Sequence, residues 1–195
     1  MDTDKNWVNW RPFDANSEFE FILCVQTDLS HVFTKTGLYL FCNCQYNARI
    51  SINTTAARTD FWLNLQNGTN RFCSLIAFNA IPDQTLNVTG ITSVSGTALF
   101  YIGSGITNVA MESYQHGGGD NGRVSLSLEN ETNKILIGCV AGSYKTTTCT
   151  STTMHYATDN NHYGCVSTFN ETGSGSFTGS GSSGGDSFVA KVAVS

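Results

Sequence analysis

Four residues in the second half of the sequence are of the types that could in principle assemble a zinc site. Cys149, His155, His162 and Cys165 would supply the sulfur and imidazole ligands of a Cys2His2 centre. Structural zinc sites usually supply their cysteines as close C-x2–4-C pairs, and the spacing here is much wider. We therefore expect these residues to lie on two strands and a loop, and we predict no bound metal.

Two close pairs of carboxylates could perform acid–base chemistry. Glu18 and Glu20 form one pair, and Glu129 and Glu131 form the other. Residues i and i+2 of a strand share a face and lie about 7 Å apart, a separation that a glycan hydrolase can use. A solvated sheet face explains both pairs more simply, so we predict that the protein is not an enzyme.

Two glycine-rich motifs resemble ligand loops. The run Gly179-x-Gly181-x-x-Gly184 satisfies the pattern of dinucleotide-binding loops, but that pattern must open a helix. Here it belongs to a Gly/Ser-rich stretch, 173–185, which we predict to be a loop before the final strand. His116 followed by Gly117–Gly119 resembles an esterase oxyanion loop without the nucleophile elbow. We expect a hairpin turn there and no cofactor.

The N-terminal arm, residues 1–12, contains the best candidates for an interaction site. Trp7, Trp10 and Arg11 are residue types that anchor protein interfaces. The alternative is an arm folded over its own sandwich with both indoles buried. Trp62 lies in an alternating stretch and is predicted to belong to the core.

The chain has seven cysteines, an odd number that cannot all pair within one molecule. Cys42 and Cys44 fall on the same strand face as Leu38 and Leu40, where a reduced cysteine behaves as a small apolar side chain. We expect reduced thiols, and some disulfide content stays open as the alternative.

Charge and hydropathy narrow the classes of partner. Only 13% of the 195 residues are charged and the net charge is −5, which disfavours nucleic-acid binding. No stretch approaches the roughly 18 apolar residues that span a bilayer. The sequence starts at Met1 without a basic segment and an apolar run, so we expect no secretory signal and no membrane partner.

Alternating apolar residues predict an all-β protein. Nineteen glycines and two prolines favour a sandwich or barrel. A short helix over 73–80 is the one alternative element. The predicted strands cover Glu18 to Gln26, Gly37 to Tyr46, Arg49 to Thr54, Asp60 to Leu65, Thr97 to Ile102, Val124 to Leu128, Lys134 to Gly142, His162 to Phe169 and Ser187 to Val194.

Several short features recur in the same order at a spacing of 89 to 91 residues, which indicates an internal duplication. Phe78-Asn79 corresponds to Phe169-Asn170, and the strand from Leu99 corresponds to that from Phe188. We predict an arm at 1–12, a first β-sandwich at 13–105 and a second at 106–195, both jelly-roll-like.

Two stretches resemble known β-sandwich families. The phrases from Phe33 to Phe41 and from Ser95 to Gly103 resemble the jelly-roll sandwiches of tumour-necrosis-factor-like trimers. The Gly/Ser-rich ending from Gly173 to Val194 resembles the C-termini of β-sandwich proteins from tailed-bacteriophage particles. The resemblance implies a virion protein without catalytic residues.

On this resemblance we expect a capsid decoration (cement) protein on the outside of a phage head. It would be made in the host cytoplasm, lie on the virion surface and contact the major capsid protein, copies of itself, or both, as a dimer or trimer. The alternative is a tail-fibre tip that reads a host glycan through the loops Asn64 to Arg71 and Tyr114 to Arg123.

Overall fold

The computed structural model of the chain describes residues 20–25, 27–66, 68–93, 95–131, 133–141, 144–150, 154–158, 163–167 and 171–195. All the regular secondary structure in these ranges is β-strand, which confirms the all-β class. The strands form three sheets, and all the paired neighbours are antiparallel. The described part of the chain contains no helix with the length and apolar character needed to cross a bilayer.

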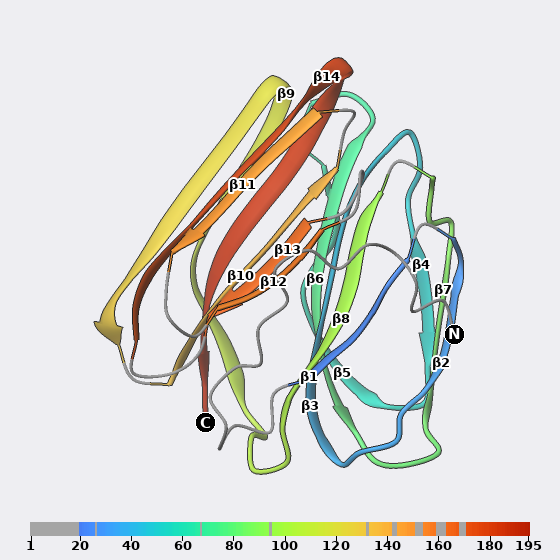
Figure 1. Cartoon of the computed structure of the whole chain (residues 1–195). Helices are drawn as coiled ribbons and strands as arrows, with labels where there is room; N and C mark the ends of the chain where they lie inside the picture. The colour runs from blue at the N-terminus through green and yellow to red at the C-terminus, as the bar shows by residue number, and fades with distance from the viewer. Residues whose placement is uncertain are drawn as a thin grey trace.

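The first half of the chain forms two sheets, which lie against each other in Figure 1. The five-stranded central sheet has the order β1 (Glu20–Cys24), β8 (Gly96–Gly103), β3 (Gly37–Tyr46), β6 (Arg71–Ala80) and β5 (Ala57–Gln66). The three-stranded outer sheet has the order β2 (Leu29–Val32), β7 (Thr85–Thr89) and β4 (Ser51–Thr54).

The second half forms one six-stranded sheet on the other side of the central sheet (Figure 1). Its order is β11 (Tyr144–Thr150), β14 (Glu171–Val194), β10 (Lys134–Ala141), β13 (Tyr163–Ser167) and β12 (Met154–Thr158), and β9 (Val109–Glu131) pairs with β14.

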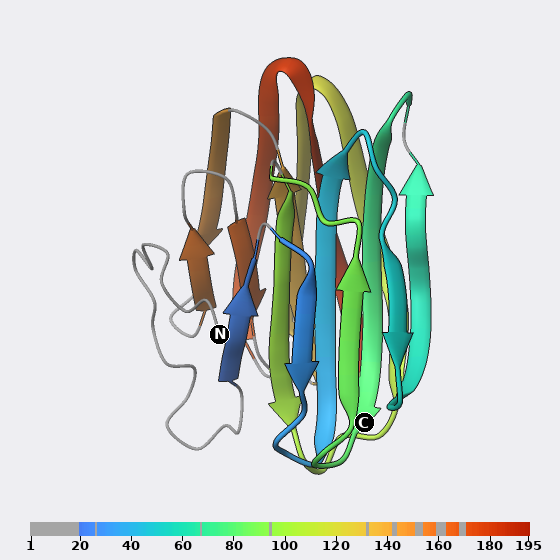
Figure 2. The same cartoon turned by 90° about the vertical axis from the view of Figure 1, so that its right-hand side faces the viewer.

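The long strands β9 and β14 form a ribbon that bends back on itself. Residues 110–118 of β9 pair with the part of β14 that also pairs with β10, whereas residues 121–127 pair with the part that also pairs with β11. The register shifts between Ser180 and Gly185, where both strands are rich in glycine. Figure 2 shows β14 turned over as an inverted U at the top of the view. Each of the two strands therefore has two segments, one on the β10 side of the bend and one on the β11 side.

This ribbon corrects two expectations. Gly117–Gly119 lies inside β9 and is not a hairpin turn, and residues 173–185 lie inside β14 and are not a loop. Glycines in a strand interior allow the sharp bend that a side chain would hinder, so the same composition that indicates a loop can mark a corner between layers.

The two halves share an order of strands. The central sheet has the order β1-β8-β3-β6-β5. The second half has the order β9-β14-β10-β13-β12, so that each strand of the second list takes the place of the strand at the same position in the first list. The outer sheet order β2-β7-β4 corresponds to the order β9-β14-β11 beyond the bend. This agreement is what a duplication would produce. The division into two sandwich halves at 105/106 stays a prediction, and the chain passes from β8 to β9 at that point.

The three inner strands of the central sheet, β8, β3 and β6, are buried on both faces, so the sheet contributes to two cores. Alternate residues such as Leu40 and Leu75 meet β10 and β14 in the inter-half core, and their neighbours such as Phe41 and Phe78 meet the outer sheet in the aromatic core. The inter-half core consists of Leu38, Leu40, Cys42, Cys44, Cys73, Leu75, Ala77, Ala98, Phe100, Ile102, Ile135, Ile137, Cys139, Ala141, Phe188, Ala190, Val192 and Val194. The aromatic core consists of Leu23, Leu29, Phe33, Tyr39, Phe41, Ile50, Ala56, Ile76, Phe78, Ala80, Leu86, Val88, Ile91, Leu99 and Tyr101.

Burial on both faces also explains why the sequence left a short helix over 73–80 open as an alternative, which the structure does not form. That segment is β6, paired with β3 on one side and β5 on the other. Strands covered on both faces are continuous apolar runs without alternation, and such runs cannot be distinguished from buried helices by their period.

Candidate functional site

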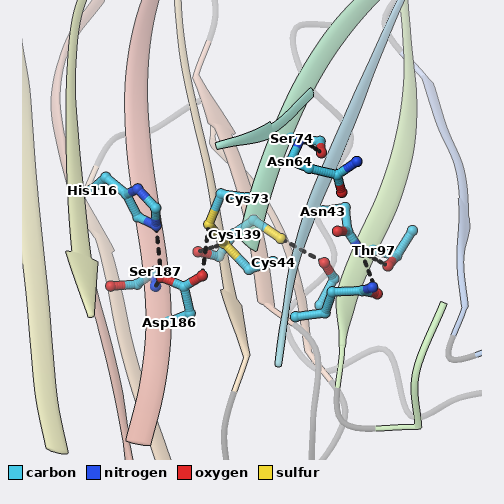
Figure 3. Close-up of a disulfide and its surroundings, with 12 residues drawn as sticks. Asn43, Cys44, Asn64, Cys73, Ser74, Thr97, His116, Cys139, Asp186 and Ser187 are labelled. Carbon is cyan, nitrogen blue, oxygen red and sulfur yellow. Dashed lines mark hydrogen bonds and ion pairs between the residues drawn. A yellow bond between two sulfur atoms is a disulfide. The ribbon is translucent and has the colours of Figure 1, made fainter. Parts of the chain in front are cut away.

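A group of sulfur, carboxylate and imidazole side chains lies at one end of the inter-half core (Figure 3). We call it the Cys–Asp–His cluster, and it consists of Cys44 on β3, Cys73 on β6, His116 on β9 and Asp186 on β14. The side chains of His116 and Asp186 are 6% and 1% exposed. The cluster is therefore closed to bulk solvent and joins strands from both halves.

Strand register places the two cysteines side by side. Cys44 and Cys73 are direct partners in the β3–β6 ladder, their Cα atoms lie 4.3 Å apart, and a disulfide bond joins them. This separation is that of antiparallel partners between which no backbone hydrogen bonds are exchanged, where side chains approach most closely. The expectation of reduced thiols throughout the chain is wrong for this pair. Cys42 keeps its free thiol and faces the inter-half core with Leu38 and Leu40, as predicted.

Asp186 lies at the centre of the cluster. Its Oδ1 is 2.7 Å from Nε2 of His116 and accepts a hydrogen bond from the Ser187 amide at 3.1 Å, whereas its Oδ2 is 3.2 Å from Sγ of Cys73. Burial raises the pKa of Asp186 above its ordinary value, because desolvation disfavours the charged carboxylate. The hydrogen bond and charge of His116, the Ser187 amide and the charge of Arg71 act in the opposite direction.

Donor atoms of three different strands converge here. The two sulfur atoms and a carboxylate oxygen of Asp186 all lie within 4.8 Å of one another. Cys139 of β10 completes the surroundings, because its carbonyl oxygen is 3.6 Å from Sγ of Cys44 and its own Sγ donates to the Gly96 carbonyl at 2.8 Å. Thiolate sulfur and carboxylate oxygen are both ligands of zinc.

A second feature is an aromatic surface at the edge of the same core. The rings of Trp62 on β5 and Tyr114 on β9 lie 4.7 Å apart, and Trp62 also contacts Phe188 edge-on at 5.7 Å. Tyr114 is 49% exposed. Trp62 was predicted to belong to the core, and it is half-buried against the inter-half core at its margin.

The side chains of most of the site residues that the sequence suggested lie outside the part of the chain that the structure describes. Trp7, Trp10 and Arg11 lie outside the described residues, as do His162 and Glu18. The side chains of the other members of the candidate zinc quartet and of the Glu129/Glu131 pair also lie outside the description, which leaves those candidates untested: Cys149, His155, Cys165, Glu129 and Glu131. The remaining acidic candidate, Glu20, forms an ion pair with Lys35 on the surface.

Sequence reasoning missed the Cys–Asp–His cluster, although one signal pointed toward it. Asp186 is an acidic residue directly before the mostly apolar predicted strand 187–194, and a carboxylate in a core strand needs a partner. Its partners lie 70 residues away at His116 and 113 residues away at Cys73. Without the order of the strands in space, no spacing rule connects these positions.

A scan against protein-family models, a search of curated proteins and a search of solved structures each find no match to this chain. The case for a function therefore depends on the residues, the strand order and the geometry described above.

Proposed function

We propose that the protein is a non-enzymatic structural component of a tailed-phage particle, a decoration protein on the outside of the head. Its partners would be the major capsid protein and further copies of itself. The proposal is supported first by the nested strand pairing of the first half, in which β1 pairs with β8, β2 with β7 and β3 with β6. Nested pairing of this kind is that of a jelly roll, an architecture common in viral capsid and lectin domains.

The distribution of reactive side chains also supports a structural role. The cluster with the chemistry of a reaction centre is buried between two sheets, where a substrate cannot reach Asp186 or His116. Among the described residues, the exposed large hydrophobic side chains are Val32 on β2, Ile81 just after β6 and Tyr114 on β9. Such a molecule is suited to contacts through its surface and its N-terminal arm.

Deleting residues 1–12 tests the decoration role. Under the proposal, the truncated protein keeps its cooperative unfolding transition but no longer cosediments with capsids that lack the native decoration protein. A matched full-length variant, Ile81→Ala, should still cosediment. Capsid binding that is retained by the truncated protein would argue against this role. Failure of both the truncated protein and the full-length Ile81→Ala variant to bind capsids would also argue against it.

The alternative role, a receptor-binding fibre tip, is favoured by the Trp62–Tyr114 surface. Aromatic faces stack on the apolar faces of sugar rings, and Tyr114 belongs to one of the two segments expected to read glycans. That segment, 114–123, is part of β9 and not a loop.

A glycan array distinguishes the two roles. Specific signals with the wild-type protein that disappear in Tyr114→Ala and persist in Ile81→Ala would favour the fibre tip. An array without signals, together with capsid cosedimentation, would favour decoration.

A further inference from the structure

Three ligand groups suited to a thiophilic cation converge at the junction of the two halves. The sulfur atoms of Cys44 and Cys73 and an oxygen of Asp186 lie within 4.8 Å of one another, and all three side chains are buried. We propose that Cys44, Cys73 and Asp186 bind a zinc ion when the two cysteines are reduced. This site differs from the quartet of cysteines and histidines that the sequence alone suggested, and it does not depend on the particle role.

The donor set selects the class of metal. Thiolates favour zinc and other thiophilic ions over magnesium and calcium, which take oxygen ligands. Two thiolates and one carboxylate carry three negative charges, and a divalent ion compensates two of them. The positive charge of Arg71 also favours the carboxylate of Asp186, as the smallest of the influences on that group. A buried carboxylate beside two sulfur atoms is costly without such compensation.

His116 has the position of a residue that orients a ligand. Its Nε2 is 2.7 Å from Oδ1 of Asp186, so the other oxygen, Oδ2, is the one that faces the sulfur of Cys73 at 3.2 Å. Metal-binding side chains are commonly held in this way by a hydrogen bond on the atom that does not bind the ion. His116 is therefore a positioning residue.

The disulfide and the ion exclude each other. Reduction breaks the bond between Cys44 and Cys73 and takes two electrons and two protons from a dithiol reductant, which becomes a disulfide in turn. The two thiols then release their protons to solvent when they bind zinc as thiolates. The oxidised protein would thus have a covalent link between β3 and β6 of the central sheet, whereas a metal bound to the reduced protein would also connect these strands to β14 of the second half.

Cobalt titration of the full-length protein tests the site. After treatment with tris(2-carboxyethyl)phosphine, the wild-type protein should bind Co²⁺ in equimolar amount with a thiolate-to-cobalt charge-transfer band, and Zn²⁺ should abolish the band. The oxidised protein should show no band. Cys44→Ala and Cys73→Ala should lose it, whereas His116→Ala should keep it with an affinity lower by about 10- to 100-fold.

Two controls separate this site from other cysteines. Cys42→Ala removes a buried thiol from the same face of β3, and Cys149→Ser/Cys165→Ser removes the cysteines of the sequence-derived quartet. Both should bind cobalt like the wild type, and far-UV circular dichroism checks that every variant folds. Loss of the band in either control would overturn the proposal. Equal binding by oxidised and reduced wild-type protein would also overturn it, and that comparison needs no variant.

Discussion

The two faces of the central sheet differ in chemistry although the same strands build them. On the face toward the outer sheet, the rings of Tyr39 on β3 and Phe78 on β6 pack against Phe33, which follows β2, with centroids 4.7 and 5.9 Å from that of Phe33. Facing the second half, the same strands present leucine and cysteine, and this core ends in the Cys–Asp–His cluster. Alternation along β3 and β6 therefore lets one strand contribute to a core of aromatic and aliphatic side chains and to a core that ends in a carboxylate, an imidazole and a disulfide.

The two cores also differ in the segments that they join. The aromatic core joins segments of one half, 20–103, whereas the inter-half core joins both halves. Among the described residues, the disulfide and the buried Asp186–His116 pair thus lie at the junction between the halves. Variants on the two faces should reveal this difference.

The largest effect is expected from truncating the aromatic core. Phe41→Ala should lower the free energy of unfolding by about 3–5 kcal/mol, because a fully buried ring is removed and a cavity remains. Its neighbour Leu40 faces the opposite core, and Leu40→Ala should cost about 2–5 kcal/mol. Denaturation by guanidinium chloride measures both, and Val32→Ala at an exposed position is the control. A loss below about 1 kcal/mol for Phe41→Ala would contradict the burial described here.

Reducing the Cys44–Cys73 bond should have the next largest effect. The bond closes a loop with a sequence separation of 29, for which chain entropy predicts a stabilisation of about 3–4 kcal/mol. Denaturation with and without reductant, in the presence of a chelator, measures the loss. The variant Cys44→Ala/Cys73→Ala should not respond to reductant, and an undiminished response would assign the effect to other cysteines.

The stability of the protein should depend on pH through Asp186 in the inter-half core and through His31 beside the aromatic core, in opposite directions. The larger effect is expected from Asp186. Burial raises the pKa of Asp186 above 3.8 in the folded protein, so the folded state holds the proton more strongly than the unfolded state. The stability contribution of Asp186 is therefore present at low pH and is lost as the pH rises from 3.8 through the raised pKa. Asp186→Asn, measured without metal, should remove this loss. A pH profile of stability unchanged by the substitution would contradict the assignment.

A smaller effect of opposite sign is expected beside the aromatic core. Burial lowers the pKa of His31 below 6.5, and its ring packs edge-on against Phe33 at 5.3 Å. The unfolded state then binds the proton more strongly, so stability is lost as the pH falls from 6.5 through the lowered pKa. His31→Gln should flatten this part of the profile, and urea denaturation between pH 5 and pH 7 would detect it. An identical slope in wild type and variant would exclude His31 as its source.

Part of this architecture can be predicted from the sequence for clear physical reasons. Strand β3 begins at Gly37, as predicted from a turn residue before an alternating run. Gly37 has φ +137°, and a Cβ there would lie 2.2 Å from the Gly103 carbonyl oxygen, so the strand start requires glycine. The shared face of Cys42, Cys44, Leu38 and Leu40 also follows from alternation and is confirmed.

Other elements could not be predicted because their signals depend on the fold. The β6 run lacks alternation since both of its faces are covered. Several glycines of β9 and β14, within 117–122 and 179–185, lie around a bend inside these strands and not in a hairpin turn or a loop. The Cys–Asp–His cluster assembles only when β3, β6, β9 and β14 are brought together. Pairing between such distant strands leaves no trace in local composition.

The most direct test of the zinc site is anomalous diffraction from crystals of the reduced protein grown with zinc. Data collected on both sides of the zinc absorption edge should give a single strong anomalous peak between Sγ of Cys44, Sγ of Cys73 and Oδ2 of Asp186. Continuous density for a Cys44–Cys73 disulfide without a peak in those crystals, or a peak only at Cys149 and Cys165, would contradict the account.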